Sequence, residues 1–384
     1  MTDPAAAAHG RRVQEHVAAQ IVAAGGWLSF ERFMDLALYA PGLGYYSGGA
    51  QKLGAGGDFT TAPEVSGLFG ACVAVQCAEV LREVTAAAIL EIGAGSGRLA
   101  VDLLERLESL QALPQRYLIL EISADLRERQ RRLLEVRLPQ LIDRIQWIDS
   151  PPPTPFDGII IANEVVDALP VARFRWQSGG TQELGVAIDG SNFAWAPRTA
   201  DAAMAEMCRR LSDAAGGWDE GYVSEYCPRV AAWTLAVAQS LRRGAALWFD
   251  YGLPRAQYYL PERHEGTLIC HYRHQAHADP FVHVGLQDIS AWVDFTLLAE
   301  AARAAGFELA GFTTQAYFLA GTGIDREMRR RAGRDENVFA RLAGEARQLM
   351  MPGEMGERFK AMAWLKGLDI PLSGFALQDL RHTL

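Results

Sequence analysis

The sequence predicts an α/β protein built on a parallel sheet with crossover helices. The first observation is that short apolar runs alternate with helical stretches of about a dozen residues, the runs lying at 89–97, 117–123, 145–149 and 158–164. The second is that the first run ends in alternating glycines, as at a tight strand-to-helix turn. The third is a balance of 49% apolar and 22% charged residues, which is typical of a folded globular chain.

Ahead of this core, the chain predicts a helical segment followed by a long loop. Apolar residues recur every four positions within 13–21, so residues 11–40 are interpreted as helical with a break at a glycine pair. Glycine is too dense over 41–57 for a helix or a strand, and long ordered loops are often functional. An apolar, alanine-rich helix is expected over 65–84.

The alternation stops after the fourth apolar run. The segments RFRW and ELGVAID flank the turn SGGT, so residues 171–190 predict a hairpin. Next we expect helices over 199–214 and 229–242 and a buried strand over 245–252. A third helix is expected over 295–305, and two further strands within 307–318. Residues 253–293 show few patterns typical of a helix or a strand, and the tail from 325 is predicted to be mostly helical.

These elements favour one interrupted core over two equal domains. We predict an N-terminal helical extension with a Gly-rich lid loop over 1–64 and a core divided into two parts, 65–170 and 245–320. Between the core parts lies an insertion of a hairpin and helices on the substrate side, over 171–244, and a C-terminal helical tail follows over 321–384. The insertion then falls between the fourth and fifth strands of the core.

Charge and cysteine content exclude several classes of protein. Lys and Arg total 37 against 46 Asp and Glu, and the net charge of −9 argues against nucleic acid and anionic lipid as partners. The densest basic run, Arg326–Arg334, is interpreted as a solvated helix face. No uncharged stretch reaches the ~18 residues of a membrane-spanning helix, and the start lacks the apolar region of a secretory signal. Five cysteines without a C-x-x-C pair favour reduced thiols, so we expect a cytoplasmic location.

A glycine-rich motif, EIGAGSG at 91–97, lies where a strand turns into a helix, which is where parallel sheets bind ligands. A dinucleotide fingerprint needs a small residue where Arg98 stands, and a P-loop needs Lys followed by Ser or Thr after its last glycine. Neither condition is met. The remaining pattern lets backbone pass closely under a ligand that has no pyrophosphate, while Glu91 can receive a cationic amine. S-adenosylmethionine carries such an amine, and we predict that it is held here by Glu91, Gly93, Ala94 and Gly95.

A second acid supports this cofactor. Glu121 ends the next predicted strand, where a carboxylate can accept hydrogen bonds from both ribose hydroxyls, and Ser123 follows it. Trp147 and Asp149, at the end of the run after that, complete the predicted cofactor site. The alternative is that Glu121 caps the helix starting near Asp125 and that the glycines serve only a turn.

Longer motifs resemble a known family. They are GYYSGGAQKLGAGGDFTTAPEVSGLFG at 44–70, LEIGAGSGRLA at 90–100, NEVVDALPV at 163–171, FDYG at 249–252 and GLQDISAWVDF at 285–295. Over residues 10–320 the chain resembles the MidA-like S-adenosylmethionine-dependent methyltransferases, a family that includes a protein arginine methyltransferase. The resemblance implies a class I methyltransferase sheet of the Rossmann-like type, with an N-terminal helical extension and an insertion between strands 4 and 5.

In that fold, the carboxyl end of the fourth strand faces the transferable methyl group. Methyl transfer is an in-line displacement, so the enzyme must align the acceptor and orient its lone pair. Asn163 can accept a hydrogen bond from the acceptor nitrogen, and Glu164 with Asp167 can hold an arginine guanidinium, so we predict these three as catalytic. The alternative for Asp167 is a cap on the following turn. Asp250, at the end of the fifth strand, is either an acceptor-pocket residue or a buried structural acid.

The segment after the Gly-rich loop is a candidate lid. Thr60 and Thr61 are predicted to contact the cofactor, because hydroxyls, the carboxylates of Asp58 and Glu64, and a proline-fixed helix start can fold over it. Capping of a helix is the alternative role for Thr61 and Glu64. The pattern H-x-x-H-x-x-H at 271–277 invites a metal, but no helix is evident there to gather the three rings, so we predict no metal.

Three hypotheses about function follow. The first is an S-adenosylmethionine-dependent methyltransferase that acts on a protein, at an arginine nitrogen. The second keeps the cofactor and moves the acceptor to a small molecule or another side chain. The third is an assembly factor that binds the cofactor as a structural ligand and acts by docking a partner. Substitution of Glu164 distinguishes the third hypothesis from the first two, because a docking protein keeps its cellular role when catalysis is lost.

Overall fold

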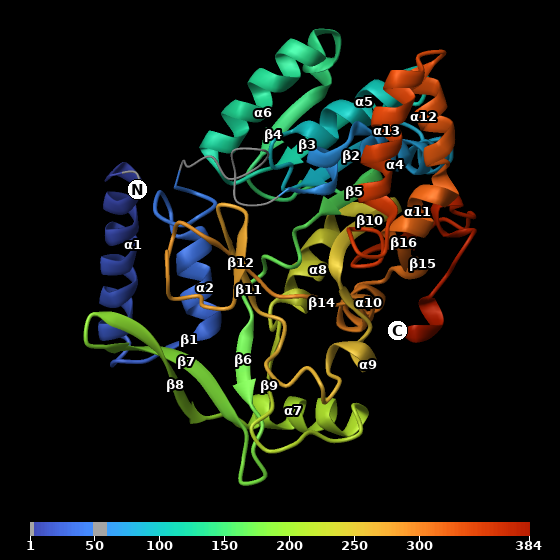
Figure 1. The fold of residues 1–384 in the computed structure, drawn as a ribbon. Helices are drawn as coiled ribbons and strands as arrows, with labels where there is room; N and C mark the ends of the chain where they lie inside the picture. Colours follow the sequence, from blue (N-terminus) through green and yellow to red (C-terminus); the bar gives the residue numbers. More distant parts are fainter. Residues whose placement is uncertain (1–3, 49–59) are drawn as a thin grey trace. The chain divides into compact units, whose positions relative to one another are not determined.

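A computed structural model describes residues 4–48 and 60–384 (Figure 1). The chain forms two compact units. Unit 1 comprises Met1–Phe59, Asp167–Val230 and Leu253–Thr296, and unit 2 comprises Thr60–Val166, Ala231–Gly252 and Leu297–Leu384. These units cut across the five predicted segments, because stretches that are distant in sequence share each core. Part of the predicted Gly-rich loop, together with Asp58, lies outside the described residues.

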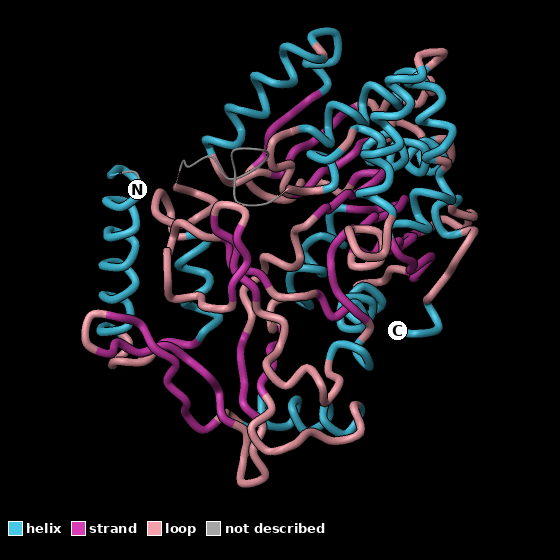
Figure 2. The backbone as a smooth tube through the Cα atoms, viewed as in Figure 1, coloured by secondary structure: helices cyan, strands magenta, loops and turns pink. Residues whose placement is uncertain are grey.

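Unit 2 is built on a sheet (Figures 1 and 2), and its central strands pair in parallel. Its strands follow the order β15-β16-β10-β5-β2-β3-β4. The parallel strands are β4 (Ile145–Ile148), β3 (Arg116–Leu120), β2 (Ala88–Ile92), β5 (Phe156–Asn163) and β10 (Leu241–Leu253). Between β10 and β15 (Glu308–Thr314) runs the antiparallel β16 (Phe359–Lys366). The predicted α/β class with a Rossmann-like parallel sheet is confirmed.

Apolar side chains fix the helices that cover one face of this sheet. Alternate strand residues such as Ile89, Ile161 and Phe249 share one buried cluster with residues of α4 (Gly67–Leu81), α5 (Arg98–Ser109), α11 (Gln315–Thr322) and α13 (Glu336–Met350). The other helices of unit 2, or bordering it, are α3 (Ala62–Val65), α6 (Ala124–Arg137), α8 (Val230–Ser240), α10 (Phe295–Ala304) and α12 (Ile324–Ala332). Short 3-10 turns lie at Pro139–Arg144, Ser373–Phe375 and Arg381–Thr383.

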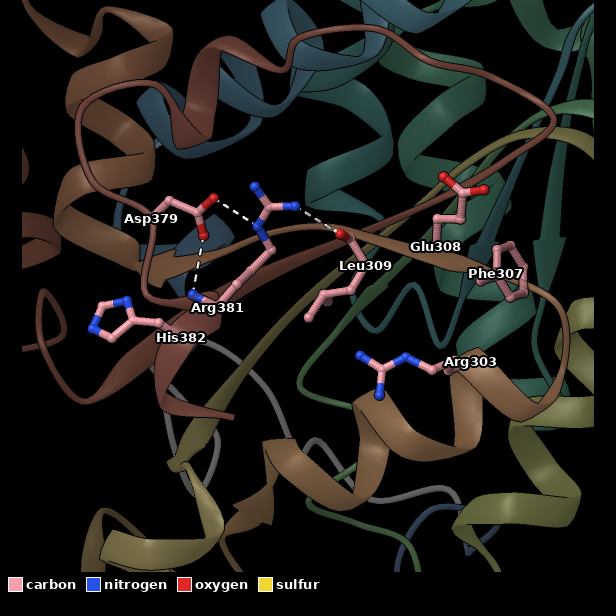
Figure 3. A pocket seen from close by; sticks show the side chains of 7 residues that line it. All are labelled: Arg303, Phe307, Glu308, Leu309, Asp379, Arg381 and His382. Carbon is pink, nitrogen blue, oxygen red and sulfur yellow. Dashed lines mark hydrogen bonds and ion pairs between the residues drawn. The ribbon is translucent and has the colours of Figure 1, made fainter.

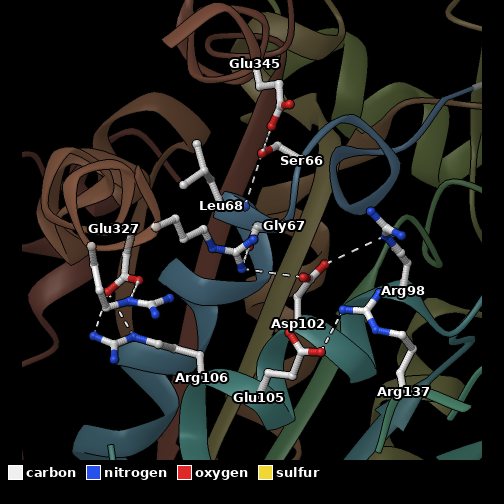
Figure 4. Close-up of polar contacts among 12 residues, drawn as sticks. Ser66, Gly67, Leu68, Arg98, Asp102, Glu105, Arg106, Arg137, Glu327 and Glu345 are labelled. Atoms are coloured by element: carbon white, nitrogen blue, oxygen red, sulfur yellow. Dashed lines mark hydrogen bonds and ion pairs between the residues drawn. The ribbon is translucent and has the colours of Figure 1, made fainter. Parts of the chain in front are cut away.

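Ion pairs and hydrogen bonds tie the C-terminal helices to the first core helices (Figure 4). Arg106 on α5 pairs with Glu327 on α12 at 2.7 Å, and the Glu327 side chain is only 3% exposed. Arg331 donates to the carbonyl of Gly67 at the start of α4, at 2.8 Å. The basic run Arg326–Arg334 is therefore partly bound into unit 2, where we expected a solvated face, because buried acids on α5 and α12 neutralise its guanidinium groups.

Unit 1 contains two antiparallel sheets. The larger has the order β1-β7-β6-β9, with β8 beside β7, and its strands are β1 (Leu28–Ser29), β6 (Ala172–Arg175), β7 (Gln182–Asp189), β8 (Asn192–Thr199) and β9 (Val223–Tyr226). The antiparallel pairing of β6 with β7 confirms the predicted hairpin. The smaller sheet is formed by β11 (Ile269–Tyr272), β12 (Gln275–His277) and β13 (Asp288–Ser290), in the stretch where the sequence gives few signals.

The N-terminal helices belong to unit 1. The predicted helical segment forms α1 (Pro4–Ala23) and α2 (Phe30–Tyr39), and the apolar repeat on α1 is fully buried. Aromatic rings surround α2, with Phe33 packing edge-on against Phe193 and Phe281. The remaining short elements are α7 (Ala202–Ala214), α9 (Arg255–Tyr258) and β14 (Val293–Asp294).

The C-terminal part of the chain differs from two expectations. Residues 307–318 form β15 and the start of α11 rather than two strands, because the Thr314 side chain caps α11 by accepting a hydrogen bond from the Tyr317 amide. The expected helical tail contains β16 after its last α-helix, α13, and this strand completes the core sheet. Because β16 is buried on both faces, its sequence shows no alternation that would distinguish it from a buried helix.

Candidate active site

The glycine motif forms the turn between β2 and α5, at the carboxyl edge of the parallel strands. Gly93, Gly95 and Gly97 all have positive φ, at 65°, 55° and 84°, a region that other residues enter only with strain. The Gly93 amide donates to the Leu120 carbonyl of β3 at 3.0 Å. β2 lies between β3 and β5, so the strand order reverses here, which is where open α/β sheets bind ligands.

Glu91 lies under this turn. Its side chain is 2% exposed and accepts a hydrogen bond from the Tyr117 hydroxyl of β3 at 2.7 Å. Burial raises the pKa of Glu91 to about 7. The carboxylate is therefore held by the sheet itself, and its contact with a cofactor amine stays a prediction.

Glu121 directly follows β3 and is joined to the glycine turn through a residue that we did not predict. The Ser123 amide donates to Glu121 Oε1 at 2.9 Å, and Gln130 Nε2 donates to Glu121 Oε2 at 3.1 Å. Gln130 Nε2 also donates to the Gly95 carbonyl at 2.9 Å, while Gln130 Oε1 accepts from Trp147 Nε1 at 3.0 Å. Gln130 is fully buried on α6 and links three of the predicted cofactor positions.

A sequence signal for Gln130 exists. The buried residues of α6 recur every four positions, at Leu126, Gln130 and Leu134, so an amide interrupts an apolar stripe. Ser123 is the N-cap of this helix and accepts from the Leu126 amide at 3.4 Å. Capping therefore falls to Ser123, whereas Glu121 keeps a separate place at the strand end, and burial raises the pKa of its carboxyl.

The other predicted cofactor residues flank the same edge. Trp147 is half-buried on β4, with the Arg131 guanidinium 4.5 Å from the centre of its ring, and Asp149 is exposed just after β4. Thr61 precedes α3 and makes no capping hydrogen bond through its side chain, and Thr60 is exposed. Ser96 of the glycine turn donates to Glu64 on α3, which brings the 60–64 segment to the turn.

The carboxyl end of β5 holds two of the three predicted catalytic residues. Glu164 has a φ of +54°, an unusual backbone conformation for a residue other than glycine. Asn163 Nδ2 donates to Glu164 Oε1 at 3.2 Å, while Asn163 Oδ1 is buried and accepts no hydrogen bond from the described residues. Asp167 belongs to unit 1, where it is 6% exposed, so the predicted set is divided between the two units.

Two hollows of unit 2 lie away from this edge. One, of about 750 Å³, is lined by residues that include Arg303, Glu308 and Arg381, and its Arg381 is already bound by Asp379 and the Leu309 carbonyl (Figure 3). The other, of about 450 Å³, is lined by residues preceding β2, β3 and β4. The second hollow lies at the amino edge of the parallel strands, opposite the glycine turn, and the first lies beside the start of β15. No predicted site residue lines either of them.

The predicted histidine pattern lies on the smaller sheet of unit 1. The histidines of 271–277 lie on β11, β12 and the turn between them, and His271 Nδ1 is 3.9 Å from Asp288 Oδ2. In the part of the chain that the structure describes, no group of three or more His, Cys, Asp or Glu side chains could hold a metal ion. Over the same residues, no helix has the length and apolar character needed to cross a bilayer. The absence of a metal requirement stays a prediction.

The residues at the carboxyl edge fit S-adenosylmethionine. The turn at 93–97 presents backbone and little side chain, which suits close approach of a ligand, and it offers no P-loop lysine for a triphosphate. The carboxylate of Glu121 after β3 can accept hydrogen bonds from paired hydroxyl groups, and the indole of Trp147 is joined to it through Gln130. These groups would hold the ribose and the base of an adenosyl ligand.

Comparisons with known proteins agree with this fit. Residues 72–313 match the family described as "putative S-adenosyl-L-methionine-dependent methyltransferase". The chain is 30% identical to the mitochondrial protein arginine methyltransferase NDUFAF7 of Danio rerio, over 97% of this chain and 94% of that protein, and 27% identical to its Homo sapiens counterpart, over 88% and 80%. A crystal structure of a Burkholderia thailandensis protein bound to S-adenosyl-homocysteine superimposes with a TM-score of 0.95 at 42% identity, covering 100% of this chain and 99% of that one.

Proposed function

Because the chain belongs to the S-adenosyl-L-methionine-dependent methyltransferase family matched over residues 72–313, we propose that its methyl acceptor is an arginine nitrogen of a protein. The observation that carries this proposal is Glu164, a carboxylate fixed beside Asn163 at the carboxyl end of β5, next to the strand that bears the glycine turn. The names of the curated relatives, which are protein arginine methyltransferases, support it.

The chemistry asks little of the protein beyond positioning. When bound, the cofactor supplies a methyl group on a sulfonium, which an acceptor lone pair displaces in line. Glu164 can accept hydrogen bonds from a guanidinium and so draw its positive charge away from the reacting nitrogen. Asn163 Oδ1, buried and without a donor among the described residues, can accept from the acceptor N–H. Both contacts orient the nitrogen lone pair toward the methyl group.

Labelling identifies the acceptor. Wild-type protein and tritiated S-adenosylmethionine are added to a lysate from a strain that lacks this protein, and the labelled chains are mapped by mass spectrometry. We expect methyl groups on arginine. Label confined to lysine, glutamine, nucleic acid or small molecules would contradict the proposed acceptor and leave the family assignment intact. The oligomeric state of the purified protein is measured separately by light scattering.

The docking hypothesis has its own test. A strain carrying Glu164→Gln in place of the wild-type chain should lose the cellular function of the protein, because that function depends on methyl transfer. A control strain that carries Asp335→Asn instead, a change at the remote N-cap of α13, should keep this function. Full function of the Glu164→Gln strain, combined with absent methylation, would favour a role in docking a partner.

We also propose a cytoplasmic location. The five cysteines are free thiols in the structure, which is typical of a reducing compartment. Burial raises the pKa of all five, for example to about 12 for Cys72. The curated relatives are named as mitochondrial proteins, so cell fractionation is informative. Recovery of the protein in a membrane-bounded or exported fraction would contradict this location.

A further inference from the structure

Asp250 lies near the carboxyl end of β10 and is hydrogen-bonded to the turn that follows Glu164. Its side chain is 1% exposed, and both carboxylate oxygens accept hydrogen bonds from backbone amides. Oδ2 accepts from Val166 at 2.9 Å and from Val165 at 3.3 Å, and Oδ1 accepts from Tyr251 at 3.0 Å. One buried carboxylate therefore joins the end of β10 to the turn that follows β5.

The turn held in this way contains the unusual conformation of Glu164. The Glu164 amide donates to the Phe249 carbonyl at 2.8 Å, so the amides of three consecutive residues, 164 to 166, are all bound to the end of β10. A positive φ at a glutamate persists only where the surroundings fix it, and such strain concentrates at functional sites. The bonds to Phe249 and Asp250 provide that constraint.

We propose that Asp250 is a positioning residue for methyl transfer: it fixes the 164–166 turn and thereby sets the direction of the Glu164 carboxylate toward the acceptor. This inference rests on the proposed role of Glu164. A carboxylate suits the task because both of its oxygens accept hydrogen bonds. An asparagine of the same shape offers one acceptor oxygen, so it would leave either the Tyr251 amide or the Val165 and Val166 amides facing an NH₂ group.

Three substitutions test the positioning role. Asp250→Asn should lower the rate of tritiated methyl incorporation from lysate by at least ~10-fold at saturating S-adenosylmethionine, with affinity for S-adenosylhomocysteine within about 3-fold of wild type. Asp250→Glu keeps both oxygens but displaces them by one methylene, and should fall between. Asp335→Asn is the control, because Asp335 is an exposed aspartate that likewise accepts hydrogen bonds from backbone amides, those of Asn337 and Val338, and this variant should match wild type.

A double variant distinguishes positioning from general structural support. If Asp250 acts through Glu164, then Asp250→Asn combined with Glu164→Gln should be no slower than Glu164→Gln alone, within about 3-fold. Rate losses that multiply would overturn the inference, as would a wild-type rate for Asp250→Asn. If neither Asp250 variant binds S-adenosylhomocysteine, the residue serves folding and the inference is overturned too. A wild-type rate for Glu164→Gln would instead refute the proposed role of Glu164, whereas label on residues other than arginine would refute the proposed function.

Discussion

Two strand ends on the same sheet of unit 2 hold their acids in different ways. At the end of β3, Glu121 is buried and bound by the side chain of Gln130 and the amide of Ser123. At the end of β5, Glu164 is half-buried, and its position depends on a strained backbone bound to β10. The first region is a side-chain network suited to one constant ligand, whereas the second presents a carboxylate in a fixed direction. This difference predicts that cofactor binding and methyl transfer can be impaired separately.

The largest expected effect comes from breaking the glycine turn. Gly95→Val should reduce the affinity for S-adenosylhomocysteine by at least ~10²-fold, because valine resists a φ of 55° and places side-chain atoms where backbone and ligand meet. Calorimetry measures the affinity. Gly333→Val is the matched control, since Gly333 has a φ of 57° with open space around it. Equal affinity of both variants would show that the turn does not bind the cofactor.

The next effect is on the rate of methyl transfer, with cofactor affinity preserved. Glu164→Gln should lower methyl incorporation by at least ~10²-fold, the scale of a lost electrostatic partner in the transition state, while affinity for S-adenosylhomocysteine stays within a few-fold. Asp167→Asn should do less. The rate is measured with tritiated S-adenosylmethionine and the labelled substrate from lysate. Full activity of Glu164→Gln would contradict the guanidinium mechanism.

A smaller effect is expected on the cofactor side. Gln130→Leu removes hydrogen bonds to Gly95, Glu121 and Trp147 and should weaken binding of S-adenosylhomocysteine by about 10-fold, the scale of one or two neutral hydrogen bonds. Gln76→Leu is the control, because Gln76 is equally buried in unit 2 and bonds to Gly374 away from the site. A comparable loss in both variants would indicate general destabilisation.

The last expected effect is on stability rather than on binding or rate, and it concerns pH and Glu91. Its pKa is raised to about 7 by burial, above the value of an unfolded glutamate, so the folded state holds the proton more tightly. Between pH ~4.5 and ~7 the unfolded chain ionises first, and the free energy of unfolding should fall as pH rises, by about 3 kcal/mol from this group. Glu91→Gln should remove that part of the slope in urea titrations. Identical slopes for variant and wild type would contradict the raised pKa.

The sequence predicts the cofactor side better than its supporting contacts. The glycines of 93–97 and the acids Glu91 and Glu121 follow from local pattern, because turns and strand ends are encoded by adjacent residues. Gln130 and Asp250 act through contacts between elements distant in sequence, and spacing alone does not identify their partners. For the same reason the sequence misses β16, whose place in the sheet depends on β10 and β15. The two units likewise depend on long-range packing.

The functional independence of the two strand ends is tested most directly by the cofactor affinity of one double variant. Gln130→Leu combined with Glu164→Gln is titrated with S-adenosylhomocysteine by calorimetry beside Gln130→Leu alone. We predict the same Kd for both, within about 2-fold, since Glu164 serves the acceptor and not the cofactor. A Kd for the double variant that is ~10-fold weaker than that of Gln130→Leu would contradict this prediction and place Glu164 in the cofactor site.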